Sequence, residues 1–382
     1  MKKTIVLCSI SLIMIAVACK KDLIENTTPD NYSGTPILPS TPYDYLHSNN
    51  DNLATLGRVL FYDKNLSLNG SVACASCHQQ EKAFCDNLQF STGLEDLKTK
   101  RNSPSIFAKQ GRMFWDGRAS SISNLMLKPI KNHIEMKFDN LDKLASKLSK
   151  ISYYPDLFNN AFFSPIIDST KIQSALAEFI SNFTFSNNRF NQSQKFGTAL
   201  NPSEKIGKDV FFGKGKCSEC HHIDGGGNLN GYGFTDMDFN IGLDQTYTDN
   251  GIGALTGNAS DNGKFMVATL LNVEFTSPYM HDGRFKTLEE VVEHYNSGVK
   301  NHPNLSGTLR NTEAFNNMTE QQLLQLFDAN HDGQLTEDEF SSIAPQQLNL
   351  TDLEKKSLVT FLKTLSDATI LVDKRFSNPF KY

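Results

Sequence analysis

Hydrophobic and polar positions follow helical spacing in two related segments of the chain. The segment LGRVLFYD, residues 56–63, and the segment IGKDVFFG, residues 206–213, share a glycine, an apolar stripe and a pair of aromatic residues. Apolar residues that recur every three to four positions predict an amphipathic helix. We expect the glycine to permit close approach of a neighbouring helix and the aromatic pair to face a core.

An amphipathic helix is expected at the end of each half of the chain. KIQSALAEFISNF, residues 171–183, has this pattern in the first half, and DLEKKSLVTFLKTL, residues 352–365, has it in the second. Thr351 is the expected N-cap of the second of these helices, with Glu354 at the capping-box position. The order of these elements predicts a degenerate internal repeat.

The chain is expected to be all-α, with two helical domains and extensive loops. Its 382 residues exceed what one hydrophobic core usually holds. Alternating β-branched residues are scarce, and Asn- and Gly-rich stretches such as residues 224–233 are long. We expect a linker near residues 192–202, before a helix opened by Ser203, and therefore domains at residues 46–195 and 196–382.

The charge of the chain does not point to a nucleic-acid partner. The sequence has 37 Lys and Arg against 42 Asp and Glu, for a net charge of −5. Both signs are well mixed along the chain, and a basic patch that would attract a phosphate backbone is missing from the sequence pattern. We therefore expect no binding to nucleic acid.

The first residues predict a secretory signal. A basic start is followed by an apolar run at residues 5–18 that is too short for a good membrane span, and then by Cys19. The ending AVAC resembles a bacterial lipoprotein signal, in which residues 1–19 direct export and Cys19 carries the lipid. An uncleaved anchor and ordinary secretion are the alternatives. Residues 20–45 are expected to be a flexible tether, which places the protein at the cell envelope, facing the periplasm.

Two CxxCH pentapeptides, CASCH and CSECH, carry the strongest chemical signal. Two thiols three positions apart can form thioethers to the vinyl groups of a haem, and the next His is then placed to bind its iron. A four-cysteine zinc site and a CxxC redox pair are the alternatives, but the wide separation of the motifs and the lack of a βαβ frame disfavour them. Cys85 is expected to be a buried or unpaired thiol. The residues that would attach the two haems are Cys74, Cys77, His78, Cys217, Cys220 and His221.

The segments around these motifs resemble the bacterial di-haem cytochrome c peroxidases and their MauG-like relatives. The likeness is carried by GRVLFYDKNLSLNGSVACASCH, KRNSPSIFAKQGRMFWDGR, KPIKNHIEM and TLLNVEFTSPYMHDGRFKTLEEVVEHYNSG, and it runs from about residue 53 to residue 365. It implies two cytochrome c-like haem domains. The first would react with peroxide, and the second would pass electrons to it.

The resemblance also implies roles for side chains of the first domain. Glu135 matches the carboxylate that moves a proton between the two peroxide oxygens, although a lone Glu in a Lys-rich stretch is usually a solvated residue. Trp115, the only Trp, matches an aromatic residue between the haems, where a core residue can also relay electrons. Leu125 stands where many relatives have a Gln. Arg118 would bind a haem propionate or form a structural turn with Asp116.

Two positions separate the branches of this family. Reductively activated peroxidases have a second His ligand where this chain has Leu94, so we expect the first iron to be open or water-bound in the oxidised protein. Tyr295 matches the second ligand of the other iron, which is Met in the peroxidases and Tyr in MauG-like enzymes. Core packing of Tyr295 is the alternative, with Met280 or Met318 as the iron ligand. His281 is expected to hold loops by hydrogen bonds and not to bind iron.

Two calcium sites are expected. The family's calcium at the domain interface implies ligands at Asn102, Thr276 and Pro278. The segment DANHDGQLTEDE, residues 328–339, fits a twelve-residue EF-hand loop, inserted in the second domain, with an acidic helix-connecting loop as the alternative. The EF-hand positions are Asp328, Asn330, Asp332, Gln334, Thr336 and Glu339.

We therefore expect a di-haem c-type peroxidase that reduces hydrogen peroxide. Its electrons would come through the second haem from a small redox protein such as a cytochrome c or a cupredoxin. One rival is a MauG-like oxidase that acts on a protein or organic substrate through high-valent haems. Another is a non-enzymatic electron carrier, and a third is a calcium-regulated binding protein.

Overall fold

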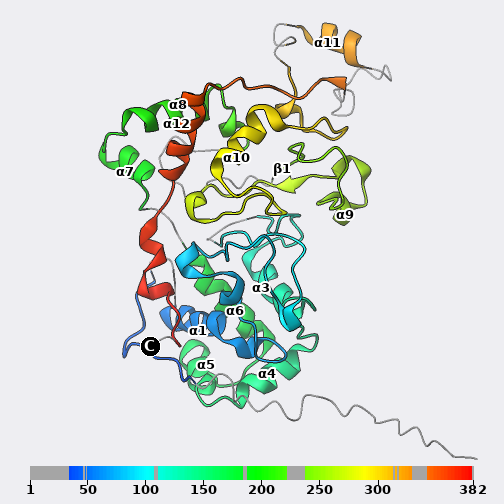
Figure 1. Ribbon diagram of the computed structural model, residues 1–382. Helices are drawn as coiled ribbons and strands as arrows, with labels where there is room; N and C mark the ends of the chain where they lie inside the picture. The colour runs from blue at the N-terminus through cyan, green and yellow to red at the C-terminus, as the bar shows by residue number, and fades with distance from the viewer. Residues whose placement is uncertain are drawn as a thin grey trace, which may run out of the picture.

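Two helical lobes form the protein, one above the other in the view of Figure 1. This computed structural model describes residues 34–45, 48, 50–106, 111–183, 187–221, 237–312, 315, 318–328 and 342–380. The predicted signal, residues 1–19, and the first part of the predicted tether, residues 20–33, lie outside these ranges. Within the described ranges, no helix is both long and apolar enough to cross a membrane.

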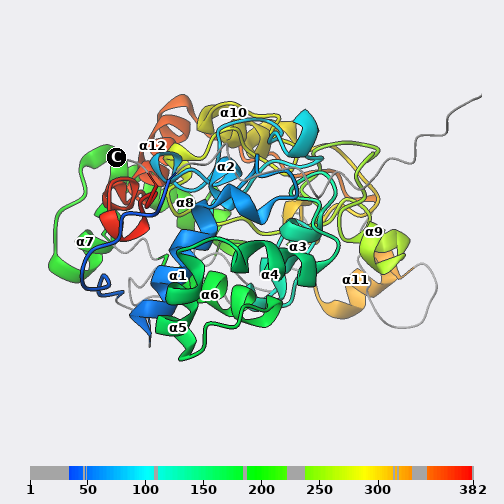
Figure 2. The ribbon, with the colours of Figure 1, turned by 90° about the horizontal axis from the view of Figure 1, so that it is seen from below.

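The lower lobe is formed by the helices of the first half of the chain. The side chain of Asn50 caps the first of these helices, and that of Asp168 caps the last. The two helices, α1 and α6, pack side by side, as Figure 2 shows from below. The helices of this lobe are α1 (Asp51–Tyr62), α2 (Cys74–Cys77), α3 (Ile122–Lys131), α4 (Leu141–Ser149), α5 (Tyr154–Phe162) and α6 (Ser169–Ser181).

The upper lobe is formed by the second half of the chain. Its helices are α7 (Arg189–Phe196), α8 (Pro202–Phe212), α9 (Gly253–Thr256), α10 (Leu288–Glu293), α11 (Glu320–Phe327) and α12 (Asp352–Lys363). The strands β1 (Asp238–Phe239) and β2 (Phe265–Met266) pair antiparallel, with Asp238 opposite Met266. Sheet is limited to this pair in the described ranges, so the predicted all-α class is confirmed.

Short helical turns lie between these elements. A π-helical turn, His294–Gly298, directly follows α10. The 3₁₀ turns are Lys64–Leu66, Gln80–Lys82, Leu94–Asp96, Cys217–Glu219, Ala259–Asp261, Val273–Phe275, Gly307–Leu309, Ala368–Leu371 and Lys374–Phe376.

Each lobe contains a helix crossing in which a glycine meets the backbone of another helix. A Cβ atom on Gly57 of α1 would lie 1.9 Å from the carbonyl oxygen of Ala175 on α6. A Cβ atom on Gly207 of α8 would lie 1.9 Å from the carbonyl oxygen of Ser357 on α12. The predicted close approach at both glycines is confirmed, and the two lobes repeat the same packing.

The aromatic pairs after these glycines behave differently in the two lobes. Phe61 and Tyr62 are both buried at the end of α1, as predicted. At the end of α8, Phe211 is buried, but Phe212 is 40% exposed. The prediction for Phe212 was therefore wrong: this ring lies near those of Phe211 and Phe361 but stays partly at the surface, at the end of α8.

The start of α12 has the predicted capping box. The backbone N–H of Glu354 donates to the hydroxyl of Thr351 over 3.3 Å, and the Thr351 N–H donates to the Glu354 carboxylate over 2.7 Å. In α8 the equivalent box is formed by Asn201 and Glu204, so this helix begins at Pro202, one residue before the predicted Ser203.

The predicted linker is helical over its first part. Residues 192–202 include the second half of α7, which belongs to the upper lobe. Phe190 of α7 packs edge-on against Phe361 of α12, with 5.2 Å between ring centroids, and its N–H donates to the carbonyl oxygen of Thr364. Helix α7 is therefore packed against α12 of the upper lobe.

The chain returns to the lower lobe after α12, as the red segment of Figure 1 shows. There Phe376 packs against Phe183 at the end of α6, with ring centroids 5.1 Å apart. The last residues of the predicted second domain thus complete the core of the first. Residues 34–45, expected to be part of a flexible tether, lie against this returning segment: Ile37 N–H donates to the carbonyl oxygen of Pro379 over 2.9 Å.

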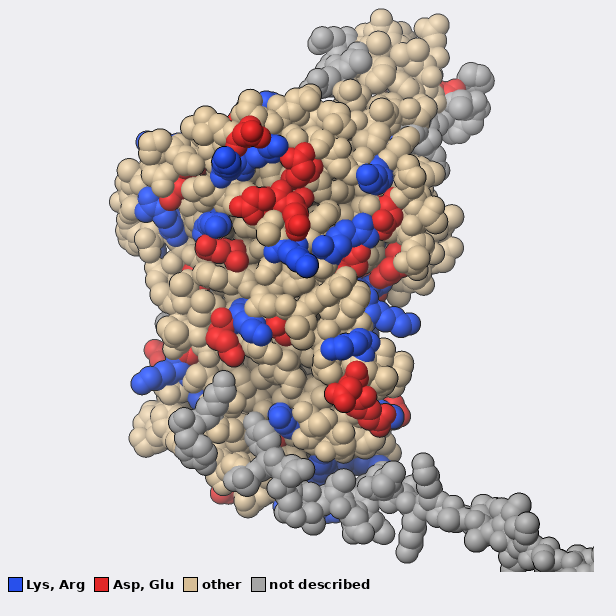
Figure 3. All heavy atoms as spheres, in the orientation of Figure 1, with Lys and Arg blue, Asp and Glu red and all other residues tan. Residues whose placement is uncertain are grey.

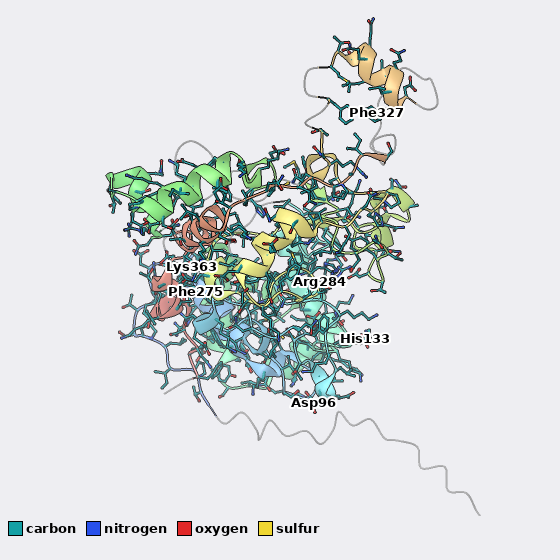
Figure 4. The ribbon with its side chains drawn as sticks, turned by 45° about the horizontal axis from the view of Figure 1, so that its top comes forward. Asp96, His133, Phe275, Arg284, Phe327 and Lys363 are labelled. Carbon is teal, nitrogen blue, oxygen red and sulfur yellow. The ribbon has the colours of Figure 1, made fainter. Side chains whose placement is uncertain are left out.

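Helix α11 projects from the upper lobe, and Figure 4 shows its Phe327 far from Arg284 and Phe275 in the body of the protein. The chain leaves and re-enters the lobe through a short stem of two paired segments. Asn311 N–H donates to the carbonyl oxygen of Ala344, and Gln346 N–H donates to that of Leu309, both over 2.8 Å. The EF-hand positions after Asp328 lie within residues 329–341, outside the described residues.

The stem is fixed by a buried arginine. Arg310 is 1% exposed, and its guanidinium donates to the carbonyl oxygens of His302, Pro303, Leu305 and Ile343. A buried guanidinium needs an acceptor for each donor it turns inward, and these carbonyl oxygens supply them. The two ends of the projecting segment are therefore held by one side chain.

Charge is well mixed on the surface. On the face drawn in Figure 3, Lys and Arg side chains lie among Asp and Glu side chains over both lobes. This arrangement agrees with the mixed charge pattern of the sequence.

Replacement of either crossing glycine should destabilise the protein. In Gly57→Ala and Gly207→Ala the added methyl group would meet backbone, which cannot move aside as a side chain can. We expect each change to lower the free energy of unfolding by about 1–3 kcal/mol, the usual effect of overpacking. Thermal and urea unfolding of the haem-loaded protein would measure the loss.

Gly307→Ala is the matched control, because nothing lies within 4 Å of a Cβ atom built there. Its effect should stay within about 0.5 kcal/mol. Equal stability of all three variants would contradict the role of the helix crossings.

Candidate functional site

A cavity of about 1130 Å³ has walls from both lobes. Its exposed wall is mostly apolar by area, and many polar and charged side chains also contribute to it. His78 reaches it from the lower lobe, and His221 reaches it from the upper lobe. The two predicted attachment segments therefore face the same cavity.

The ring of His78 is held in the orientation that a metal ligand needs. Its Nδ1 donates to the carbonyl oxygen of Phe84 over 2.8 Å, which leaves Nε2 as the nitrogen with a lone pair. Burial lowers the pKa of His78, which favours the neutral ring. The hydroxyl of Ser103 donates to the carbonyl oxygen of Cys77 over 3.1 Å, so a second loop braces the same segment.

The four motif cysteines are arranged as two separate pairs of thiols. Burial raises the pKa of Cys74, Cys77 and Cys217 to about 12, and that of Cys220 to about 11. In the described part of the chain, no three His, Cys, Asp or Glu side chains converge on a point that could hold a metal ion. The arrangement thus disfavours the zinc alternative.

Cys85 is buried and free, as predicted. Its thiol donates to the carbonyl oxygen of Lys82 over 3.0 Å. Burial raises the pKa of Cys85 to about 11, so this thiol is not a reactive thiolate.

Tyr295 lies on the cavity wall beside the second attachment segment. Burial raises the pKa of its phenol, and the nearby thiols of Cys220 and Cys217 raise it further. Tyr295 is part of the π-helical turn His294–Gly298, a conformation that is rare and often marks functional sites. Its position is therefore compatible with the predicted iron ligand.

The two methionines considered as alternatives lie in different places. Met280 lines the cavity, as Tyr295 does. Met318 is 36% exposed and does not line it. The geometry therefore leaves Tyr295 and Met280 as candidates for the second ligand.

The turn that carries Tyr295 is held by Asn296, which sequence patterns did not single out. Asn296 is buried, and its side-chain oxygen accepts from the N–H of Leu350 over 2.8 Å. Its carbonyl oxygen accepts from the N–H of Leu348 over 3.0 Å. The segment that leads from the stem to α12 thus fixes the backbone next to Tyr295. An Asn in a polar stretch gives no signal of such contacts.

Glu135 reaches the cavity from the loop that follows α3. Its carboxylate accepts from the side-chain amide of Asn132 over 2.7 Å. Burial raises the pKa of Glu135, while the charge of Arg118 and the bond from Asn132 oppose this rise. Leu125 also lines the cavity and adds an apolar side chain to its wall. Asn132, which the sequence did not indicate, therefore supplies the polar support for Glu135.

Leu94 packs against the backbone of the Glu135 loop. Its N–H donates to the carbonyl oxygen of Ile134 over 2.8 Å, and its side chain is 1% exposed within the hydrophobic core. It is not part of the cavity wall. Gly93 permits this approach, because a Cβ atom there would lie 2.1 Å from the same carbonyl oxygen.

Trp115 connects the two lobes. Its indole N–H donates to the carbonyl oxygen of Asn102 over 2.9 Å, and its own carbonyl oxygen accepts from Met266 N–H of β2 over 2.8 Å. The indole therefore has a fixed place on the cavity wall between the lobes.

A network of charged side chains surrounds Trp115. Arg101 donates to both carboxylate oxygens of Asp249 in the upper lobe, over 2.6 and 2.8 Å, and to Asp116 over 2.6 Å. Arg118 pairs with Asp116 over 2.9 Å and also lines the cavity. The structural turn is thus present, and it leaves Arg118 within reach of a group in the cavity.

The residues predicted for the interdomain calcium, Asn102, Thr276 and Pro278, all contribute to the cavity wall. The amide of Asn102 donates to the carbonyl oxygen of Leu88 over 2.8 Å, and its N–H donates to the carbonyl oxygen of His281 over 2.7 Å. His281 is buried, and its ring stacks on that of Phe265 with ring centroids 3.7 Å apart. Its predicted role in holding loops by hydrogen bonds stays a prediction.

Three comparisons relate the chain to known proteins. A family model for di-haem cytochrome c peroxidases matches residues 51–199. The cytochrome c551 peroxidase of Nitrosomonas europaea is 31% identical over 263 residues, which cover 67% of this chain and 76% of that protein. The methylamine utilization protein MauG of Methylophilus methylotrophus is 31% identical over 272 residues, which cover 69% of this chain and 78% of that protein.

A solved structure is similar over almost the whole chain. A MauG-like protein associated with microbial copper homeostasis superposes with a TM-score of 0.70 at 28% identity, covering 92% of this chain and 98% of that one. The diheme peroxidase BthA from Burkholderia thailandensis has the same fold, with a TM-score of 0.62 at 21% identity.

The buried carboxyl group of Glu135 should make stability depend on pH. Its pKa is raised above the ordinary 4.5 in the folded protein, so the folded state holds this proton more tightly than the unfolded state. The carboxyl therefore costs no stability below about pH 4.5, and its cost grows as pH rises through the folded pKa. Glu135→Gln should stabilise the haem-loaded protein at about pH 8 and leave it unchanged at about pH 4.

Urea unfolding at the two pH values measures this difference. Glu95→Gln is the matched control, because the Glu95 side chain is 60% exposed and pairs only with exposed Lys137 in the described contacts. A Glu135→Gln protein that is less stable than wild type at both pH values would contradict the raised pKa.

Proposed function

Because the chain belongs to the di-haem cytochrome c peroxidase family, we propose that it reduces hydrogen peroxide at a haem bound in the lower lobe. Electrons would come from a small redox protein through a second haem in the upper lobe. The family makes the chain an oxidoreductase of the peroxidase and MauG kind. The observation that carries the proposal is the position of Glu135, a carboxyl with a raised pKa, in the cavity that His78 also lines.

The residues present fit two c-type haems. Cys74 and Cys77 would form the thioethers of the first, and the Nε2 atom of His78 would bind its iron, since Nδ1 is already bonded to Phe84. The corresponding residues of the second site are Cys217, Cys220 and His221. A haem bound at each segment supplies a redox-active iron. The shared, largely apolar cavity can take both groups.

Glu135 would move the proton that heterolytic cleavage of peroxide requires. It would take a proton from one peroxide oxygen and deliver it to the other, which then leaves as water. A general acid and base works best when its pKa lies near the working pH, and burial raises the pKa of Glu135 in that direction. Asn132 orients the carboxylate through its hydrogen bond.

Trp115 would carry electrons between the two sites. Its indole is hydrogen-bonded to Asn102, and its backbone is bonded to β2 of the other lobe. An aromatic ring held on the wall between two redox groups shortens each transfer. We propose this role together with the structural role that the same contacts give it.

Leu94 and Tyr295 favour a MauG-like oxidase as the second candidate. Leu94 is buried in the core and offers no ligand to the first site, so peroxide could react without prior reduction. Tyr295 would give the second iron a hard oxygen ligand that stabilises its oxidised states. The substrate would then be a protein or an organic molecule. A pure electron carrier fits less well, because it has no use for Glu135.

Further parts of the proposal concern calcium and location. We propose one Ca²⁺ at Asn102, Thr276 and Pro278, and another in the loop that begins at Asp328. We also propose that Cys19 carries a lipid that attaches the protein to the cell envelope on its periplasmic side. The calcium-ligand chemistry and the signal pattern support these two proposals.

Loss of the Glu135 carboxyl should abolish most peroxide turnover. Glu135→Gln keeps the acceptor for Asn132 but cannot take up a proton, so kcat/KM for hydrogen peroxide should fall by roughly 10²–10⁴-fold. Stopped-flow reduction of peroxide measures this value. Glu95→Gln, a surface change in a neighbouring segment, should keep wild-type turnover. Activity within about threefold of wild type in Glu135→Gln would exclude Glu135 as the proton carrier.

Removal of the Tyr295 hydroxyl should change the spectrum of the upper-lobe haem alone. We expect Tyr295→Phe to shift its absorption and electron paramagnetic resonance signals, because the iron loses an oxygen ligand. Tyr279→Phe is the control, since Tyr279 also lines the cavity but donates its hydroxyl to Val273. Met280→Leu tests the other candidate, and a shift in that variant with unchanged spectra in Tyr295→Phe would reverse the assignment.

A further inference from the structure

We propose that Gln80 and the returning C-terminal segment, residues 368–380, position the His78 ring. Gln80 is then a positioning residue for the lower-lobe haem, and it acts through the loop 79–85 that follows the attachment motif. The proposal rests on the proposed haem at His78. Residues 368–380 lie far from both CxxCH motifs in the sequence, and in this proposal they support the His78 ring.

The side chain of Gln80 is buried and bound to the returning segment by both hydrogens of its amide. Gln80 is 7% exposed, and its Nε2 donates to the carbonyl oxygen of Ile370 over 2.7 Å and to that of Asp373 over 2.8 Å. Only an amide presents two hydrogens from one neutral nitrogen at the end of a side chain of this length. A carboxylate in its place would face both carbonyl oxygens with like partial charges.

The loop of Gln80 supplies the carbonyl group that orients His78. Gln79 N–H donates to the carbonyl oxygen of Cys85, and Phe84 N–H donates to that of Gln79 over 2.8 Å, so the loop closes on itself. The carbonyl oxygen of Phe84 accepts from His78 Nδ1. Any movement of the loop therefore changes the hydrogen bond behind the predicted iron ligand.

This loop has a backbone that needs support from its surroundings. Ala83 and Phe84 have φ angles of 53° and 60°, in the left-handed region that residues with a Cβ atom seldom adopt. Such conformations persist where neighbouring structure holds them. The two hydrogen bonds of Gln80 join the loop to a segment from the other end of the chain, which is support of this kind.

Aromatic packing joins the same segment to Phe84 from a second direction. The Phe84 ring lies 4.2 Å from that of Phe183, and Phe183 lies 5.1 Å from Phe376. Phe376 is 3% exposed, and its carbonyl oxygen accepts from the hydroxyl of Tyr62 over 2.6 Å. The returning segment thus holds both Gln80 and the ring of Phe84.

The returning segment is fixed at its origin in the upper lobe. Asp367 N–H donates to the side chain of Asn272 over 2.6 Å, and the Asp367 carboxylate accepts from Asn187 N–H over 2.8 Å. The preceding helix, α12, places Leu358 and Leu362 on the cavity wall. The support behind His78 therefore begins at a helix that borders the second haem site.

The consequence is electronic as well as structural. A His that donates its Nδ1 hydrogen strongly is a more basic ligand, and a more basic ligand stabilises the oxidised iron. If the Phe84 carbonyl group moves away, this bond weakens. The reduction potential of the lower-lobe haem should then rise, while that of the upper-lobe haem stays unchanged.

The test compares Gln80→Ala with Gln89→Ala in the haem-loaded protein. Gln89 also donates from the lower lobe to a carbonyl group of the upper lobe, Asp282, over 3.0 Å, but it lies at the surface outside loop 79–85. Spectroelectrochemistry gives the potentials of the two haems, and hydrogen exchange gives the opening of the loop. We expect Gln80→Ala to raise the potential of the lower-lobe haem and to speed exchange in residues 79–85 by about tenfold or more.

Gln80→Glu should change the potential and the exchange rates at least as much as Gln80→Ala, since a carboxylate replaces the amide donor and only accepts hydrogen bonds. If Gln80→Ala does not fold, Phe376→Leu gives the same two readouts from the aromatic side of the contact. Unchanged potential and exchange in a folded Gln80→Ala protein would overturn the proposal. A wild-type protein without peroxide turnover would overturn the proposed function alone, because both readouts are independent of turnover.

Discussion

Each lobe depends on a helix crossing at which one backbone touches another. At Gly57 and Gly207 a side chain of any size would meet a carbonyl oxygen at 1.9 Å. The helices that carry these glycines, α1 and α8, each lead into a CxxCH segment. Their close contact with α6 and α12 therefore sets where each attachment segment meets the cavity. The same close backbone contact occurs in both lobes. It explains why the helix packing of the two halves is similar although most of their side chains differ.

The contact between the lobes combines ion pairs and hydrogen bonds in one short stretch of chain. Arg101 joins Asp116 of its own lobe to Asp249 of the other, and Trp115 lies directly before Asp116. A bidentate ion pair fixes the angle between its partners as well as their distance. The segment with Trp115, which is proposed to conduct electrons, therefore also fixes the position of one site relative to the other. A change in this stretch would therefore affect the stability of the contact between the lobes, and in the proposed route it would also affect electron transfer.

Local patterns in the sequence were sufficient for much of the fold, and they are also the basis of the predicted attachment sites. The glycine-containing helices, the Thr351 cap and the two CxxCH motifs are each defined by residues close together in the chain. The support of the site was not predictable in this way, because Asn296 and Gln80 bind backbone groups that any residue can supply, and Asn132 binds the Glu135 side chain in a loop without periodicity. A lone Asn or Gln has no periodicity to detect, and its partner is known only when the chain is folded.

The same reason explains why the sequence does not show which lobe a segment packs against. The linker was predicted near residues 192–202, before the helix opened by Ser203, and Phe190 places α7 on α12 of the upper lobe. Phe376 completes the lower lobe from the other end of the chain, and nothing in its neighbours in sequence shows which core it enters. Burial of an aromatic ring can be guessed from sequence, whereas its destination depends on chain topology.

The stem below α11 has an evolutionary consequence. Leu309 and Gln346, at its two ends, are joined by a hydrogen bond, and buried Arg310 holds both sides. The entropy of closing a loop grows only with the logarithm of its length, so the lobe is almost indifferent to how much chain lies beyond such a stem. The segment beyond the stem can therefore change in length or be replaced during evolution without repacking of the haem lobes.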